Sequence, residues 1–111
     1  MKFKSLTIGE KEYYKPKIIT KLLYENGFYW LIDSEFIDAE IEIKNETMIW
    51  HSGTFLYGKW KYGIWLNGDF RDGIWENGIW ENGNFNGKFL SGIFKDGTIS
   101  DEAEVVNITK K

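Results

Sequence analysis

The sequence predicts an all-β fold, a parallel β-solenoid built from five-residue repeats, and three observations lead to this prediction. Glycine recurs every five residues from Gly53 to Gly97, with one single-residue deletion. A large apolar residue, in most units Trp or Phe, stands two positions after each of these glycines. Asn-Gly and Asp-Gly pairs, which favour tight turns, coincide with several of the repeated glycines.

A solenoid explains the five-residue period better than a helix or a flat strand does. In a helix, each glycine would cost about 1 kcal/mol relative to alanine. In a flat strand, an odd period would move the aromatic residue to the opposite face in each successive unit. The chain must therefore turn a corner once per unit, so that every aromatic side chain stays inside. We expect the glycine also to point inward, where it leaves room for the ring beside it.

Two further units precede the glycine repeat. The segments Ser34–Asp38 (SEFID) and Ala39–Ile43 (AEIEI) each carry a small residue, an acidic residue and a large apolar residue in that order. This pattern resembles that of the pentapeptide-repeat proteins, whose units read roughly Ala-Asp/Asn-Leu-x-x. The resemblance covers residues 34–99, with an interruption around 44–47, and implies a right-handed quadrilateral β-helix with four pentads per coil. The predicted core residues are Phe36, Ile41, Trp50, Phe55, Trp60, Trp65, Phe70, Trp75, Trp80, Phe85, Phe89, Phe94 and Ile99.

The charges at the outer positions give a check on coil size. Two pentads per coil would stack Lys61 on Arg71, which is unfavourable. Three or four pentads per coil would both stack only opposite charges, so the choice of four follows mainly from the resemblance. Four pentads would pair Lys61–Glu81, Asp69–Lys88 and Glu76–Lys95, whereas three would pair Lys61–Glu76 and Glu81–Lys95.

The chain divides into three segments of one compact domain. Residues 1–33 are expected to form a β-hairpin cap, because an Asn-Gly turn at residues 26–27 separates two strand-like runs within Lys21–Ile32. Such a cap would cover the open edge of the first coil. Residues 34–99 form the predicted solenoid. Residues 100–111 are expected to be a tail or a final rung.

The composition narrows the class of protein. The chain has no cysteine, which excludes disulfides and zinc–thiolate sites. Its net charge of −3 is uneven, because residues 1–21 are basic and residues 25–46 are acidic. Neither segment makes a nucleic-acid footprint, so no direct nucleic-acid binding is expected. The N-terminal segment lacks the apolar run of a signal peptide, and no stretch approaches membrane-spanning length, so we expect a cytoplasmic product that is not secreted through a signal peptide.

No residue pattern points to catalysis. His51 is the only histidine, so a Ser-His-Asp triad or a metal site is not predicted from the sequence, and a surface role is favoured for it. The glycines recur at five residues and match no phosphate-binding fingerprint. We therefore predict a protein that is not an enzyme and has no cofactor and no metal.

The tryptophans allow two interpretations. If Trp60, Trp65 and their repeat equivalents Trp75 and Trp80 faced outward, they would form a platform for stacking sugars. If they face inward, they belong to the core, and the parity of the repeat favours this interpretation. Carbohydrate is therefore not the expected partner.

The outward positions beside the aromatic residues contain several apolar side chains. With four pentads per coil, Ile74 would stack on Ile93 and begin an apolar strip on one face. A contiguous strip would indicate a contact surface for a protein partner or for self-association. The candidate contact strip consists of Ile64, Leu66, Ile74, Ile79, Leu90 and Ile93.

These features lead to two hypotheses of function. The first is a non-enzymatic structural, assembly or docking protein that acts in several copies, because short Gly-x-Trp pentad solenoids resemble small proteins of tailed phages and their fibres. The alternative is an acidic DNA mimic that inhibits a host DNA-acting or defence enzyme, as the resemblance to acidic pentapeptide-repeat dimers implies. A mimic needs a continuous acidic face, whereas residues 50–99 carry as many bases as acids.

Overall fold

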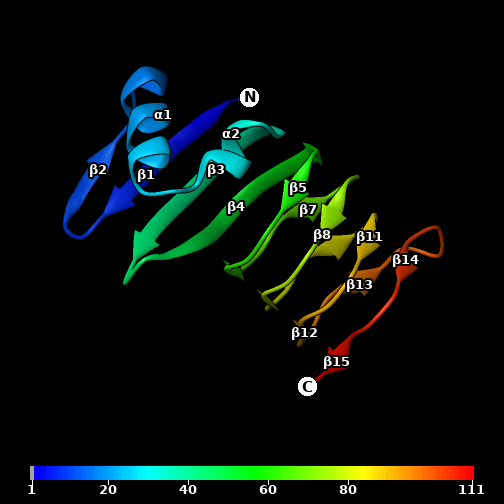
Figure 1. Ribbon diagram of the computed structural model, residues 1–111. Helices are drawn as coiled ribbons and strands as arrows, with labels where there is room; N and C mark the ends of the chain where they lie inside the picture. The colour runs from blue at the N-terminus through cyan, green and yellow to red at the C-terminus, as the bar shows by residue number, and fades with distance from the viewer. Residues whose placement is uncertain (1) are drawn as a thin grey trace.

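The computed structural model describes residues 2–111 and shows a cap, a long hairpin and a stack of coils in chain order (Figure 1). The cap contains β1 (Phe3–Ile8), β2 (Lys11–Tyr13), α1 (Pro16–Glu25) and α2 (Tyr29–Ile32). The hairpin consists of β3 (Glu35–Lys44) and β4 (Thr47–Tyr57). The coils continue with β5 (Lys59–Trp60), β6 (Ile64–Trp65), β7 (Asp69–Phe70), β8 (Ile74–Trp75), β9 (Ile79–Trp80), β10 (Asn84–Phe85), β11 (Lys88–Phe89), β12 (Ile93–Phe94), β13 (Thr98–Ile99), β14 (Glu104–Val105) and β15 (Thr109–Lys110).

The coils form a parallel β-solenoid of about four turns, as the repeat predicts. From β6 onward, each short strand pairs in parallel with the strand one coil earlier, so Trp50 lies beside Trp65 and Trp65 beside Trp80. Three such ladders make the three sides of the solenoid. The β4–β6–β9–β12–β15 and β4–β7–β10–β13 ladders share one sheet through β4, and β5–β8–β11–β14 form a separate sheet.

The coil contains three pentads, and the expectation of four is wrong. Paired strands are 15 residues apart, 14 across the deletion, as in Ile79 with Ile93, and 16 in the last rung, as in Ile93 with Thr109. The size of the rings explains the difference. Trp65, Phe70 and Trp75 of one coil meet edge to face, with centroid distances of 5.8, 6.3 and 6.4 Å, and so close a triangle. Three large rings therefore fill the cross-section.

The rings also stack in columns along the solenoid axis. In one column, Trp65 lies nearly parallel to Trp50 at 4.7 Å and to Trp80 at 4.9 Å between ring centroids. The predicted core residues from Phe36 to Phe94 are all buried, and Ile99 is half-buried because it lies in the last complete coil. The alternation of inward and outward residues thus places the aromatic residues where the sequence pattern predicts them.

The repeat glycines permit the tight corners, but at most of them the space left by the missing Cβ faces backbone before it faces a ring. Gly83 has a φ of +120°, and a Cβ atom there would lie 2.2 Å from the carbonyl oxygen of Gly68 in the preceding coil. The glycine hydrogens therefore face the backbone of the neighbouring coil, and they allow the corners to stack closely. The Asn-Gly and Asp-Gly pairs do form corners, because the side-chain oxygens of Asn67, Asp72, Asn77 and Asp96 accept hydrogen bonds from the next N–H group.

The hairpin predicted within residues 21–32 is wrong, because this region is helical. Pro16 occupies the first turn of α1, where its missing N–H and fixed φ are tolerated. Ile19 and Leu23, four residues apart, bury one face of the helix. The Asn-Gly pair that suggested a hairpin turn instead ends α1, with Gly27 at a φ of +84°. The cap does contain a hairpin, but between β1 and β2 around Gly9.

The solenoid begins later than the resemblance implies. Residues 34–43, read as two repeat units, lie mostly in β3, which pairs antiparallel with β4 and places Ile41 beside Trp50. Asn45 and Glu46 make the turn with φ values of +51° and +61°, and this turn accounts for the interruption of the repeat. β1 then pairs in parallel with β3, so the cap strands extend the edge of the first coil.

Two contacts complete the ends of the molecule. Buried Ser34 joins the cap to the first coil, because its hydroxyl donates to the Trp30 carbonyl and accepts from the Lys59 N–H. At the other end, β14 and β15 continue the ladders of β11 and β12, with Val105 beside Phe89. Of the two expectations for residues 100–111, the final rung is therefore the one found.

Candidate functional site

An isoleucine ladder runs along one outer face of the solenoid, which we call the ladder face. Its members stand just before the inward Trp or Phe residues of β4, β6, β9 and β12, and are paired laterally from coil to coil. Each is half-buried, with its remaining surface on the outside of the sheet. Thr109 of β15 continues the row as a polar residue. The isoleucine ladder consists of Ile49, Ile64, Ile79 and Ile93.

The structure divides the predicted contact strip between two faces. Ile64, Ile79 and Ile93 lie in the ladder, whereas Ile74 lies between Lys59 and Lys88 in the separate sheet. Leu66 follows Trp65 on the ladder face, and Leu90 follows Phe89 on the Ile74 face. The expected stacking of Ile74 on Ile93 is wrong because these residues are not one coil apart.

Sequence reasoning missed Ile49. The signal was available, because Ile49 precedes Trp50 as Ile64 precedes Trp65, and the two pairs are 15 residues apart. With four pentads per coil, Ile49 and Ile64 would not be lateral neighbours. Once the coil has three pentads, the Ile-Trp dipeptides at 49–50, 64–65 and 79–80 fall on one face.

A second face carries a polar ladder whose groups satisfy one another. Asn84 donates from its side-chain amide to Asp69 Oδ1 at 2.9 Å, and it accepts a hydrogen bond from the Thr98 hydroxyl. Asp69, Asn84 and Thr98 are neighbours in successive coils. These hydrogen bonds join successive coils, so the polar residues of this face stabilise the stacking of the coils.

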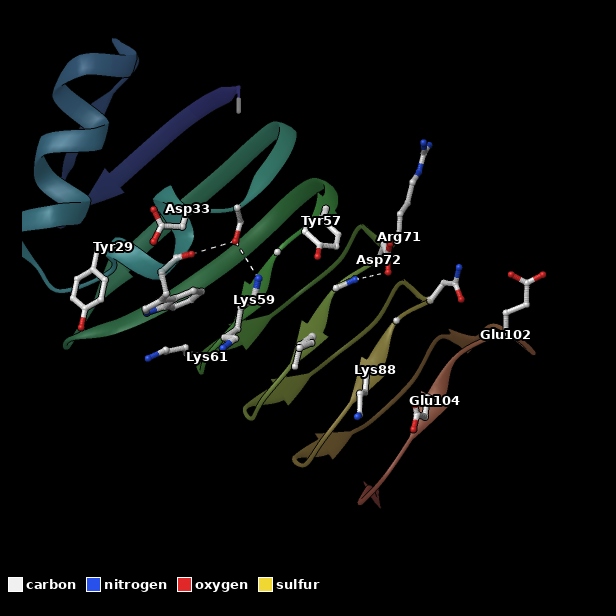
Figure 2. A pocket seen from close by; sticks show the side chains of 17 residues that line it. Tyr29, Asp33, Tyr57, Lys59, Lys61, Arg71, Asp72, Lys88, Glu102 and Glu104 are labelled. Atoms are coloured by element: carbon white, nitrogen blue, oxygen red, sulfur yellow. Dashed lines mark hydrogen bonds between the residues drawn. The ribbon is translucent and has the colours of Figure 1, made fainter.

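The third face is hollowed into a groove of about 940 Å³ (Figure 2). Ile74 and Lys88 line it, residues of α2 border one end and residues of β14 border the other. The groove carries equal numbers of positive and negative side chains, so it has no net charge that would select an anion or a cation. These charged residues are Asp33, Lys59, Lys61, Arg71, Asp72, Lys88, Glu102 and Glu104.

His51 lies on the ladder face, beside Glu42 of β3. Its Nε2 atom is 2.8 Å from Glu42 Oε1, and its side chain is 39% exposed. The hydroxyl of the next residue, Ser52, donates to Glu40 at 3.3 Å. Ser52 is therefore engaged with a carboxylate rather than with the imidazole that would activate a nucleophile. Within residues 2–111, no group of three or more His, Cys, Asp or Glu side chains is arranged to hold a metal ion.

The two ends of the ladder face differ in charge. At the cap end, Glu12, Thr7 and Glu42 are lateral neighbours on the same side of the sheet as Ile49. Glu40 is paired with Ser52 of β4, near Glu42. We call Glu12, Glu40 and Glu42 the acidic end. These three carboxylates outnumber the positive charge of Lys44 at the hairpin tip. At the other end, Lys95 lies 3.2 Å from Glu81, and the backbone N–H of Lys111 donates to Phe94, one coil below. We call Lys95 and Lys111 the basic end; Lys110 is paired with the inward residue Phe94 and does not belong to this face.

The acidic end perturbs a tyrosine, which gives a testable result. The Glu12 carboxylate accepts a hydrogen bond from the Tyr14 hydroxyl and raises the pKa of Tyr14, with a smaller contribution from the Glu40 charge. Glu12→Gln should therefore lower the Tyr14 pKa toward its ordinary value, as measured by NMR titration of the ring carbons. Glu10→Gln, a neighbouring exposed substitution, should leave it unchanged. Equal effects of the two substitutions would contradict this assignment.

The tryptophan platform considered from the sequence is not present. Trp60, Trp65, Trp75 and Trp80 have no exposed surface, and their rings pack against other rings of the core. The large aromatic side chains that do reach the surface are tyrosines, of which Tyr29 and Tyr57 border the groove. The tryptophans of the repeat are therefore part of the core.

Comparisons of the chain with protein-family models, with curated proteins and with solved structures found no match. Neither α1 nor α2 of residues 2–111 combines the length and apolar character that crossing a bilayer requires. Among the outer faces of the solenoid, the ladder face carries the row of laterally paired isoleucines.

Proposed function

We propose that this protein is a non-enzymatic docking or assembly component that binds another protein chain through the isoleucine ladder. The supporting observation is the ladder itself, four stacked isoleucines on one face. Isolated exposed apolar residues are ordinary, but a contiguous apolar row bordered by polar residues is characteristic of a protein contact surface. Adjacent strands of a sheet lie about 4.8 Å apart, so the four side chains form a continuous stripe.

The backbone behind the ladder is held by hydrogen bonds between coils, which supports a docking role. Leu66, Glu81 and Lys95 donate their N–H groups to the carbonyls of Trp50, Trp65 and Trp80, at 2.8, 2.7 and 2.8 Å. A surface held in this way loses little conformational entropy when a partner binds. The ladder is thus preorganised for recognition.

The role expected in a larger assembly is that of a virion or fibre component of a tailed phage, present in several copies. The resemblance of its Gly-x-Trp pentads to small proteins of tailed phages supports this setting. The alternative, an acidic DNA mimic, has weaker support, because Lys59, Lys61 and Lys88 interrupt the groove face and Lys95 lies on the ladder face. The acidic end is too short to imitate a length of duplex.

A photo-crosslinking residue introduced at Ile64 tests the proposal in the cells that make the protein. Illumination should produce a defined protein adduct from position 64. The same residue at Ile74 is the matched control, because it replaces an isoleucine at the equivalent outward position of another face. Adducts from position 64 should fall at least about tenfold when Ile79→Asp is added, because a charge in the apolar row must be desolvated on binding. No protein adduct from position 64, or equal adducts from both positions, would refute the docking function.

A further inference from the structure

We propose that the partner on the ladder face is a second copy of this chain, docked with its solenoid axis antiparallel to the first. This inference rests on the proposed docking function and names the partner and its orientation. It follows from three properties of the ladder face, namely its symmetry, the placement of its charges and its size.

The ladder is self-complementary, as a two-fold interface requires. A two-fold axis that lies in the interface plane, parallel to the strands and between β6 and β9, brings Ile64 of one copy opposite Ile79 of the other. The same axis brings Ile49 opposite Ile93. Because all four residues are isoleucine and lie in successive rungs of one sheet, each meets an identical side chain. Both copies then bury the same apolar row.

The charges on this face select the antiparallel orientation. Glu40 and Glu42 lie one strand beyond Ile49, and Lys111 lies in the rung beyond Lys95. In the antiparallel dimer, the acidic end of each copy faces the basic end of the other. In a parallel dimer, acids would face acids and bases would face bases. Juxtaposed like charges oppose association, so the antiparallel dimer is favoured.

The size of the molecule permits a specific contact on this face. The molecule measures 37 × 24 × 19 Å. These dimensions set an upper limit of about 700–900 Å² for one face, which is of the order of the ~800 Å² per partner that specific interfaces bury. The groove face lacks a comparable apolar row, because Ile74 is flanked by Lys59 and Lys88.

Light scattering coupled to size exclusion, over a range of protein concentrations, tests the dimer. The wild-type chain should reach the mass of a dimer. Ile64→Asp combined with Ile79→Asp should raise the dimer dissociation constant at least about 100-fold, because two charges per copy become buried at the interface. Ile74→Asp should leave the dimer intact. Circular dichroism and the Tm of each variant show whether it remains folded.

Single-cysteine variants test the orientation without background, because the chain has no cysteine of its own. Chains with Ile64→Cys and chains with Ile79→Cys are mixed in equal amounts and oxidised gently. The antiparallel dimer predicts mixed 64–79 disulfides well above the random yield, whereas a parallel dimer predicts 64–64 and 79–79 disulfides. An excess of the latter two would overturn the orientation.

The two proposals fail in distinguishable ways. A monomer at all concentrations, or a dimer that survives the double Asp substitution, would overturn self-association through the ladder. If position 64 then still forms adducts with a different protein, the docking function stands and only the identity of the partner changes. If position 64 forms no protein adduct, the docking function fails as well.

Discussion

Gly83→Ala is expected to destabilise the protein by about 3 kcal/mol or more. The φ of Gly83 is +120°, a conformation that alanine rarely adopts, and the added Cβ would lie 2.2 Å from the Gly68 carbonyl oxygen. Because that oxygen belongs to the backbone of the adjacent coil, relief would require the two coils to separate. Separation would break hydrogen bonds such as that from the Asn84 N–H to the same carbonyl, at 3.1 Å. Urea unfolding followed by tryptophan fluorescence measures the loss.

Gly9→Ala is the control that separates backbone strain from the clash between coils. Gly9 also has a positive φ, +63°, but a Cβ atom there would meet nothing within 4 Å. We expect this substitution to cost about 1 kcal/mol, from strain alone. If Gly83→Ala cost no more than Gly9→Ala, close stacking of the coils would not be the reason for the glycine repeat.

Trp65→Ala is expected to cost about 3–5 kcal/mol, the usual range for removing a large buried aromatic side chain. Trp65 has no exposed surface and stacks on Trp50 below and Trp80 above, with interplanar angles of 6° and 7°. Its loss would leave a cavity in the centre of one column and remove the edge-to-face contacts with Phe70 and Trp75. Such a cost is a large part of the 5–15 kcal/mol that stabilises a typical domain.

Trp65→Phe should cost much less, about 1–2 kcal/mol, and it is the informative comparison. A phenyl ring keeps the stacking and occurs at the equivalent site of the column, Phe94 on Trp80. It also removes the Trp65 indole N–H, which is buried without a hydrogen-bond partner. Tyr62→Ala, at a side chain that is 47% exposed, controls for loss of an aromatic ring outside the columns. A small effect of Trp65→Ala in calorimetry would contradict a core held by stacked rings.

The sequence alone was sufficient to predict the solenoid and the large apolar residues that point into it. A period of five, with glycine and a large apolar residue two positions apart, excludes helix and flat strand by steric and parity arguments. These arguments are local, since they depend only on neighbouring residues. For the same reason, the Asn-Gly and Asp-Gly corners were correctly placed.

Local signals were ambiguous in the cap. The Asn26-Gly27 pair suits a hairpin turn and also suits the end of a helix, and only the packing of Ile19 and Leu23 into the core selected the helix. Similarly, residues 34–43 alternate small and apolar side chains in a way that fits both a repeat unit and a long strand. The turn at Asn45 and Glu46 and the pairing of β3 with β4 decided in favour of the strand.

The number of pentads per coil was determined only by the tertiary structure, and with it the candidate site. The outward charges were compatible with three or four pentads per coil. Which outward residues become lateral neighbours depends on the number of residues per coil, and the circumference of the packed core sets this number. Three large rings, as in Trp65, Phe70 and Trp75, close a triangle, and this circumference aligns Ile49, Ile64, Ile79 and Ile93. The sequence thus determined which residues face outward, whereas the packing of the rings decided which of them meet.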